Sequence, residues 1–110
     1  MNESIVEYMT RFNEPTKNRF LELYNLLLES TKTEVEEKLW ARLPSFYRES
    51  RFIRLIPFNS HINIEAKAIL TYKDELQNYK ITPKGMLQIR HEQEIPKEIL
   101  RLIFRESLES

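Results

Sequence analysis

The segment RFIRLIPFNSHINIE, residues 51–65, decides the fold. Its first part, Arg51–Phe58, is rich in residues that favour β-structure and has apolar side chains on both faces, which predicts a central strand. The cluster PFNS at 57–60 is typical of a turn. In HINIE, residues 61–65, apolar and polar residues alternate, which predicts a half-buried strand. Because so few residues separate the two strands, we expect an antiparallel hairpin.

Two further strands are expected outside this hairpin. In EKLWARL, residues 37–43, every second residue from Leu39 to Leu43 is apolar, which predicts a strand with one buried face. Pro44 is expected to end the pairing of this strand or to mark a sheet edge, because proline has no N–H to donate. The sequence MLQIR at 86–90 shows the same alternation and predicts a fourth strand.

Apolar residues at helical spacing predict four helices, over residues 5–12, 14–30 and 68–79 and from Pro96 onward. The expected order of elements is α-α-β-β-β-α-β-α. We assign this order to an α+β two-layer sandwich, with a mostly antiparallel four-stranded sheet and helices on one face. Residues 1–110 are expected to form a single domain.

The composition argues against several classes of function. The 110 residues include 17 Lys and Arg and 17 Asp and Glu, and this neutral balance argues against a nucleic-acid partner. The absence of Cys excludes disulfides, thiolate metal sites and cysteine nucleophiles. The one glycine, Gly85, cannot form a glycine-rich phosphate loop. No apolar run is long enough to span a bilayer and no signal peptide is visible, so we expect a cytoplasmic protein without a membrane partner.

If helices cover one face of the sheet, every second residue of each strand points to the opposite face, which is left open. Trp and Arg are the residues that dominate binding hot spots, so Trp40 on this face indicates a recognition surface. The alternative is that neighbouring side chains or a loop cover Trp40. A small-molecule pocket between the sheet and Pro44–Phe46 is another alternative. The outward residues expected are Lys38, Trp40, Arg42, His61, Asn63, Glu65, Gln88 and Arg90, with Arg54 joining them if its strand faces the same way.

A series of short blocks covers nearly the whole chain. The blocks are EKLW at 37–40, LPSF at 43–46, HI at 61–62, YKDEL at 72–76 with YK at 79–80, KGMLQI at 84–89, and Ile95-Pro96 with Ile99 and Ile103. In order and spacing, the series resembles the YdhG-like bacterial domain family, which is described as frataxin-like. The family pattern has Tyr and a Gly-Met pair before the proline, where this chain has Trp40 and Arg42-Leu43.

The resemblance implies a small frataxin-like sandwich that is not an enzyme. It further implies weak iron binding, with no tightly bound cofactor, and delivery of the iron to iron–sulfur or haem assembly proteins. Glu37, Pro44, Phe46 and His61 match the family motif and are carried over as candidate site residues. The chain is expected to be a monomer or a homodimer.

The residues themselves offer oxygen ligands for such a cation. Glu3 and Glu7 are four residues apart on one helix face, and Glu37 belongs to an acidic cluster before the first strand. His61 and Glu65 share a strand face and could bind a metal or move a proton, although a lone surface histidine more often does neither. A solvated acidic surface is the alternative for the carboxylates. The candidate metal residues are therefore Glu3, Glu7, Glu37 and His61.

The competing function is a small-ligand or protein-interaction module with no metal role. RNA could also stack on an open face of this kind, but the neutral charge argues against it. The residues expected to form the partner or ligand face are Trp40, Arg42, Pro44, Phe46, Asn63, Glu65 and Arg90.

Overall fold

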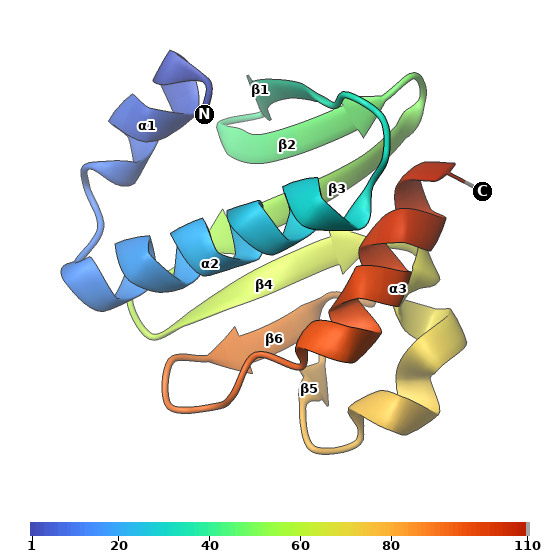
Figure 1. Cartoon of the computed structure of the whole chain (residues 1–110). Helices are drawn as coiled ribbons and strands as arrows, with labels where there is room; N and C mark the ends of the chain where they lie inside the picture. The colour runs from blue at the N-terminus through green and yellow to red at the C-terminus, as the bar shows by residue number, and fades with distance from the viewer. Residues whose placement is uncertain (110) are drawn as a thin grey trace.

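The fold is an open antiparallel sheet of six strands with α2 and α3 packed across one face, as Figure 1 shows. The computed structural model describes residues 1–109. Across the sheet the strands follow the order β1-β2-β3-β4-β6-β5. The α+β class and the antiparallel sheet are confirmed, whereas the expected number of four strands is wrong. The strands are β1 Glu36–Trp40, β2 Leu43–Arg48, β3 Arg51–Pro57, β4 His61–Ala66, β5 Lys80–Ile81 and β6 Leu87–Arg90.

The second and last helices agree with the predictions, whereas the first begins and ends earlier than the expected 5–12, at Glu3 and Met9, and the third differs in kind. This segment is a 3-10 helix, η1, over Lys67–Leu76, and not an α-helix over 68–79. The φ of −106° and ψ of 20° at Tyr72 are not helical, so a kink at this residue divides the segment into two short helices. In the described part of the chain, no helix combines the length and the apolar character needed to cross a membrane. The α-helices are α1 Glu3–Met9, α2 Glu14–Ser30 and α3 Lys97–Glu109.

The predicted central hairpin is present as β3 and β4. Leu55 and Ile64 pair across it, and both are fully buried. The connecting turn is closed by a hydrogen bond of 2.9 Å from the backbone N–H of Phe58 to the carbonyl of His61. Apolar residues on both faces of β3, such as Leu55 and Ile56, match its place in the middle of the sheet.

A second hairpin, β1–β2, replaces the single strand predicted over 37–43. The chain reverses at Ala41 and Arg42, whose φ angles of 51° and 65° are those of a tight two-residue turn. Pro44 does not end the pairing, because it lies in β2 opposite Leu39. The pairing of β2 with β3 begins one residue later, at Ser45, so the missing N–H of proline is tolerated here.

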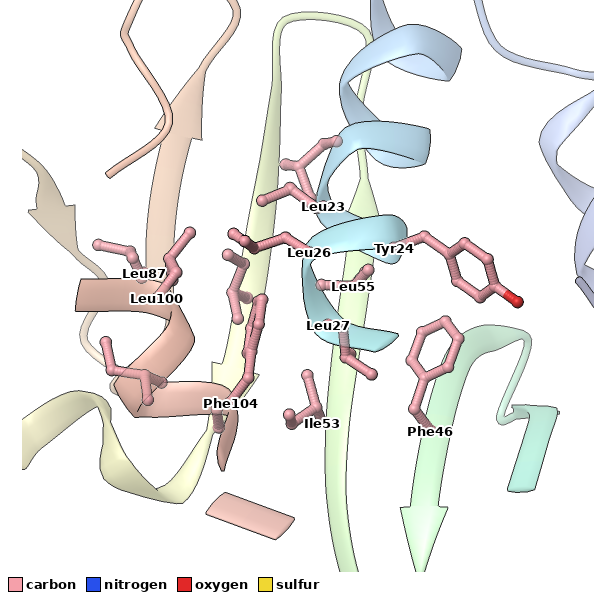
Figure 2. Close-up of a cluster of buried hydrophobic side chains, with 14 of the residues drawn as sticks. Leu23, Tyr24, Leu26, Leu27, Phe46, Ile53, Leu55, Leu87, Leu100 and Phe104 are labelled. Carbon is pink, nitrogen blue, oxygen red and sulfur yellow. The ribbon is translucent and has the colours of Figure 1, made fainter. Parts of the chain in front are cut away.

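The core lies between the sheet and the pair α2 and α3 (Figure 2). Leu23 and Leu27 of α2 and Phe104 of α3 point toward Leu55 and other inward side chains of the sheet. These side chains are almost completely buried. One face of the sheet is therefore used for stability, and the opposite face, here called the open face, carries the alternate residues of each strand.

Candidate functional site

The strand register places most of the expected outward residues on the open face. Trp40 pairs with Leu43, Arg54 with Glu65, and Asn63 with Gln88, so their side chains share one side of the sheet. The full set given by the register is Glu36, Lys38, Trp40, Leu43, Ser45, Tyr47, Phe52, Arg54, Ile56, His61, Asn63, Glu65, Lys80, Gln88 and Arg90.

Arg54 forms the centre of this face. Its guanidinium carbon lies 4.1 Å from the centroid of the Trp40 ring and 3.9 Å from that of the Phe52 ring. The side chain is only 6% exposed. Stacking of this kind is strongest where the cation is desolvated, so the contacts fix the indole and the arginine together.

Hydrogen bonds hold the same guanidinium in plane. Its Nε donates to Ser45 Oγ at 3.2 Å, and its Nη2 donates to the Tyr47 hydroxyl at 3.0 Å. Its Nη1 forms a 3.0 Å ion pair with Glu65 Oε1. Because partial burial strengthens a charge-assisted pair, Arg54 is rigid and its charge is balanced by Glu65.

Trp40 is at the edge of the sheet and is 51% exposed. The indole therefore covers Arg54 while keeping much of its surface in solvent. Arg42 is not on the strand face as expected, because it belongs to the turn that follows β1. Positive φ angles at Ala41 and Arg42 are costly for residues with a Cβ, so strained backbone adjoins the exposed indole.

Two residues predicted for the partner face are misplaced. Phe46 is fully buried in the core, where its ring packs at 5.8 Å from that of Tyr24. Pro44 has the same orientation as Phe46, because the two are two residues apart in β2. Both residues were carried over from the family resemblance, with Pro44 expected to end the strand pairing or mark an edge. Instead, β2 runs from Leu43 to Arg48, and its alternation turns Pro44 and Phe46 toward the core side of the sheet.

Asn63 lines a shallow hollow on the open face. The hollow has a volume of about 380 Å³ and lies between β3, β4 and the loop that holds Pro83 and Lys84. The Oδ1 atom of Asn63 is buried and has no hydrogen-bond partner among residues 1–109. An unpaired buried acceptor of this kind can receive a donor from a bound molecule.

Glu37, one of the candidate metal ligands, is committed to other contacts. Its Oε1 accepts the backbone N–H of Asn2 at 2.7 Å, and its Oε2 accepts the Tyr24 hydroxyl at 2.6 Å. Burial, followed by the hydrogen bond and the charge of Glu37, raises the pKa of Tyr24 to about 12. This carboxylate therefore connects β1 to α1 and α2.

His61, at the start of β4, belongs to a different part of the fold from Glu3 and Glu7 of α1, and the charged groups around it are cationic. Its ring stacks on Phe58 with centroids 4.5 Å apart, and its Nδ1 lies 2.9 Å from Ser60 Oγ. Burial lowers the pKa of His61, and the positive charges of Arg90, His91 and Lys80 lower it further. The expected pairing with Glu65 is replaced by the Glu65–Arg54 ion pair.

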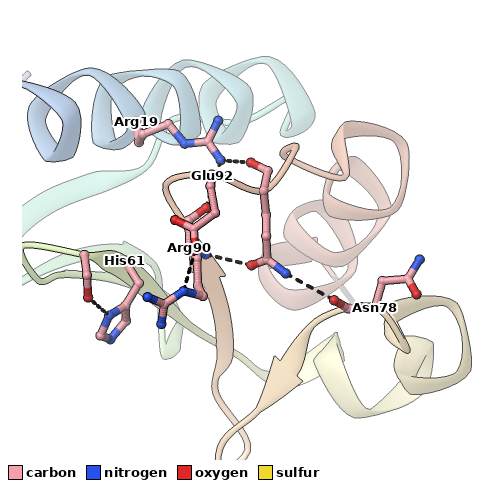
Figure 3. A network of polar contacts seen from close by, with 7 residues as sticks. Arg19, His61, Asn78, Arg90 and Glu92 are labelled. Atoms are coloured by element: carbon pink, nitrogen blue, oxygen red, sulfur yellow. Dashed lines mark hydrogen bonds and ion pairs between the residues drawn. The ribbon is translucent and has the colours of Figure 1, made fainter.

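Arg90 is part of a local network that closes the end of the sheet (Figure 3). Its Nε donates to Glu92 Oε1 at 2.6 Å, and this hydrogen bond lowers the pKa of Glu92. The Gln93 side chain accepts the Arg90 N–H and donates to the Asn78 carbonyl, and Arg19 of α2 donates to the Gln93 carbonyl. Arg90 is thus exposed on the open face, with its charge balanced by Glu92.

The candidate metal residues are not gathered into one site. Glu3 and Glu7 are exposed on α1, whereas His61 is at the start of β4. Within residues 1–109, no group of three or more His, Asp or Glu side chains is arranged to hold a metal ion. The arrangement instead favours recognition by the stack around Arg54.

The sequence prediction missed Ser45, Tyr47 and Phe52, which complete this stack. Tyr47 and Ser45 alternate with Phe46, and that period of two was the available signal for β2. The turn before it contains neither Gly nor Asn, so the usual hairpin signal was absent.

The comparisons with known proteins do not assign this chain to a family. The resemblance to the YdhG-like and frataxin-like proteins therefore stays a prediction. No protein-family model, curated protein or solved structure matches the chain.

Proposed function

We propose that this chain is a binding module, not an enzyme, and that its open face around Trp40 binds a protein partner with an acidic surface. The observation that carries the proposal is the half-exposed indole fixed on the buried, fully engaged guanidinium of Arg54. A rigid aromatic anchor loses little conformational entropy on binding, and Trp and Arg are typical of interface hot spots.

The charge around the indole favours an acidic partner. Lys38 is two residues before Trp40 on the same face of β1, and its Nζ lies 4.5 Å from the centroid of the Tyr47 ring. Arg42 adds a positive charge in the adjoining turn. Cationic residues outnumber acidic residues within β1, β2 and β3 and their turns. Lys38 forms an exposed ion pair of 3.8 Å with Glu36. Because exposed pairs are weak, this pair would compete little with carboxylates of a binding partner. Complementary carboxylates would speed association and orient the partner.

Site-specific photo-crosslinking tests the proposal in cells that express the chain natively. A benzophenone amino acid at position 38 samples the open face, and the same group at position 21 on α2 is the control, because Leu21 is also exposed. We expect one protein to crosslink from position 38 and not from position 21. The purified partner should have an acidic surface, and its affinity should fall by about tenfold or more with Trp40→Ala.

The proposal fails if position 38 crosslinks only to RNA or to a second copy of the chain, or if Trp40→Ala leaves the affinity unchanged. Trp40→Phe guards against misfolding, because it keeps an aromatic ring over Arg54. This variant should bind with intermediate affinity.

Iron delivery stays a prediction from the resemblance, and an anaerobic titration with ferrous iron tests it. Glu3→Gln with Glu7→Gln is the useful variant, because both side chains are exposed, whereas Glu37 has a structural role. Micromolar binding that this variant abolishes would support the iron role. Absence of binding at about 1 mM iron would remove it.

A further inference from the structure

A second cavity lies at the end of the sheet where β3 begins and β4 ends. Its volume is about 670 Å³, within the range of roughly 300–1,000 Å³ that holds small molecules. Its walls come from five places in the fold, namely the turn between β2 and β3, the strands β3 and β4, the start of η1, the turn before β6 and the end of α3. The lining residues are Ser50, Arg51, Phe52, Glu65, Ala66, Lys67, Leu70, Lys84, Gly85 and Ser107.

The charge of this cavity is positive. Arg51, Lys67 and Lys84 line it, and the one acidic lining residue, Glu65, is already paired with Arg54 at 3.0 Å. Neither lysine forms an ion pair within the described residues 1–109. Arg51 has an exposed ion pair with Glu49 at 3.8 Å, and such pairs are weak. The cavity is therefore lined by two lysines unpaired in the described part of the chain and one weakly paired arginine, which favours an anion.

The inner wall adds a buried hydroxyl group. Ser107 is only 3% exposed, and its Oγ accepts the backbone N–H of Ala68 at 3.1 Å. That hydrogen bond uses an oxygen lone pair, so the hydroxyl proton remains for an acceptor in the cavity. Since hydrogen bonds to charged groups are stronger than neutral ones, an anionic acceptor would gain most here.

The remaining walls offer an apolar surface and free space. Leu70 is 64% exposed, which is unusual for a large aliphatic side chain beside a cavity, and the Phe52 ring forms part of the same wall. Apart from its two chain neighbours, no residue has a heavy atom within 4 Å of the position a Cβ would take on Gly85, so there is open space at this turn.

We infer that this cavity binds a small organic anion, with its charged group on Arg51, Lys67 and Lys84 and its apolar body against Leu70 and Phe52. The inference does not depend on a protein partner at Trp40. Phe52 and Glu65 line the cavity and also contact Arg54 of the stack, but Arg51, Lys67, Lys84 and Leu70 take no part in the stack.

Isothermal titration calorimetry with phenyl phosphate, phenylacetate, inorganic phosphate and phenol tests the inference at about 150 mM NaCl. We expect saturable binding of phenyl phosphate or phenylacetate with a Kd below about 1 mM, and binding of inorganic phosphate and phenol weaker by about tenfold or more. The preferred probe distinguishes a phosphate from a carboxylate ligand.

The double variant Lys67→Gln with Lys84→Gln should weaken binding of the preferred probe by about tenfold. Lys17→Gln with Lys32→Gln removes the same charge from α2 and the residues just after it, and should leave the affinity unchanged. Leu70→Ala should weaken the preferred aromatic probe and not inorganic phosphate. Because Leu70 is exposed, this variant should fold.

The inference is overturned if neither aromatic anion binds, or if the two double variants weaken binding equally. Each of these results would leave the crosslinking at position 38 unaffected. Absence of a crosslink from position 38 would in turn leave the calorimetric result intact, so failure of one proposal is distinguishable from failure of the other.

Discussion

Glu37 illustrates how a carboxylate that looks suited to a cation is used for structure. Its two oxygens accept a backbone N–H from Asn2 and the hydroxyl of Tyr24, so the side chain joins the N-terminus of α1 to β1 and α2. The sequence shows an acidic cluster at 34–37, but it cannot show that a tyrosine thirteen residues earlier is the partner. Only the tertiary fold, which places β1 at the sheet edge within reach of Tyr24, brings the two groups together.

Tyr24→Phe should lower the free energy of unfolding by about 2 kcal/mol, because it removes a hydrogen bond to a charged group at a nearly buried site. Urea denaturation near neutral pH measures the loss. Tyr8→Phe is the control, since no hydrogen bond of its hydroxyl is found within residues 1–109, and it should change stability by less than about 0.5 kcal/mol. Equal effects of the two substitutions would contradict the role given to Glu37.

Phe46 and Trp40 occupy opposite faces of the sheet, so their replacement by alanine should lower the free energy of unfolding by different amounts. Phe46→Ala should cost about 3–5 kcal/mol, because a fully buried ring leaves a cavity in the core. Trp40→Ala should cost only about 1 kcal/mol, the size of a partly exposed cation–π contact, because Arg54 keeps its hydrogen bonds. Chemical denaturation of both variants measures these free energies of unfolding. Similar losses of stability in the two variants would place Trp40 in the core.

At the level of elements, the β1–β2 turn is the feature that the sequence least revealed. Tight two-residue hairpins favour Asn-Gly, whereas this turn holds Ala41 and Arg42 at positive φ. Without the turn signal, residues 37–43 are predicted as one strand, and no strand is predicted between Pro44 and Arg51. The β3–β4 hairpin was predictable because PFNS at 57–60 marks the turn and the flanking strands have clear apolar patterns.

Replacing Ala41-Arg42 with Asn-Gly should raise the free energy of unfolding by about 1 kcal/mol, because both new residues adopt positive φ more readily. Arg42→Ala is the matched control, since it removes the guanidinium but keeps the Cβ and should bring no gain. Thermal and urea unfolding of the two variants provide the comparison. A gain with Arg42→Ala as large as that of Asn-Gly would show that charge, and not backbone strain, matters here.

For the molecule as a whole, the division into a helix-covered face and an open face was predictable, and the contents of the open face were only partly so. Alternation correctly oriented His61, Asn63 and Glu65, because a strand period of two needs no tertiary information. It could not show that Glu65 pairs with Arg54 or that Phe52 and Trp40 stack on the guanidinium. Those contacts join β1, β3 and β4, so they depend on the complete sheet order.

The stability of the whole domain should decrease on mild acidification because of His61. Burial lowers its pKa in the folded state, and Arg90, His91 and Lys80 lower it further, whereas the unfolded chain has the ordinary value of about 6.5. The unfolded state therefore binds the proton more readily. The stability contributed by the neutral ring is present above pH 6.5 and is lost as the pH falls through the folded-state pKa.

Urea midpoints at about pH 7.5 and about pH 5.5 measure this loss, and His61→Gln is the comparison, because glutamine does not titrate. The midpoint of the wild-type chain should fall more between the two pH values than that of His61→Gln. Glu92 is not the source of the change, because its pKa is lowered from the ordinary 4.5 and its carboxylate becomes protonated only at more acidic pH. If both proteins lose the same stability, the cationic surroundings of His61 do not control the acid sensitivity of the fold.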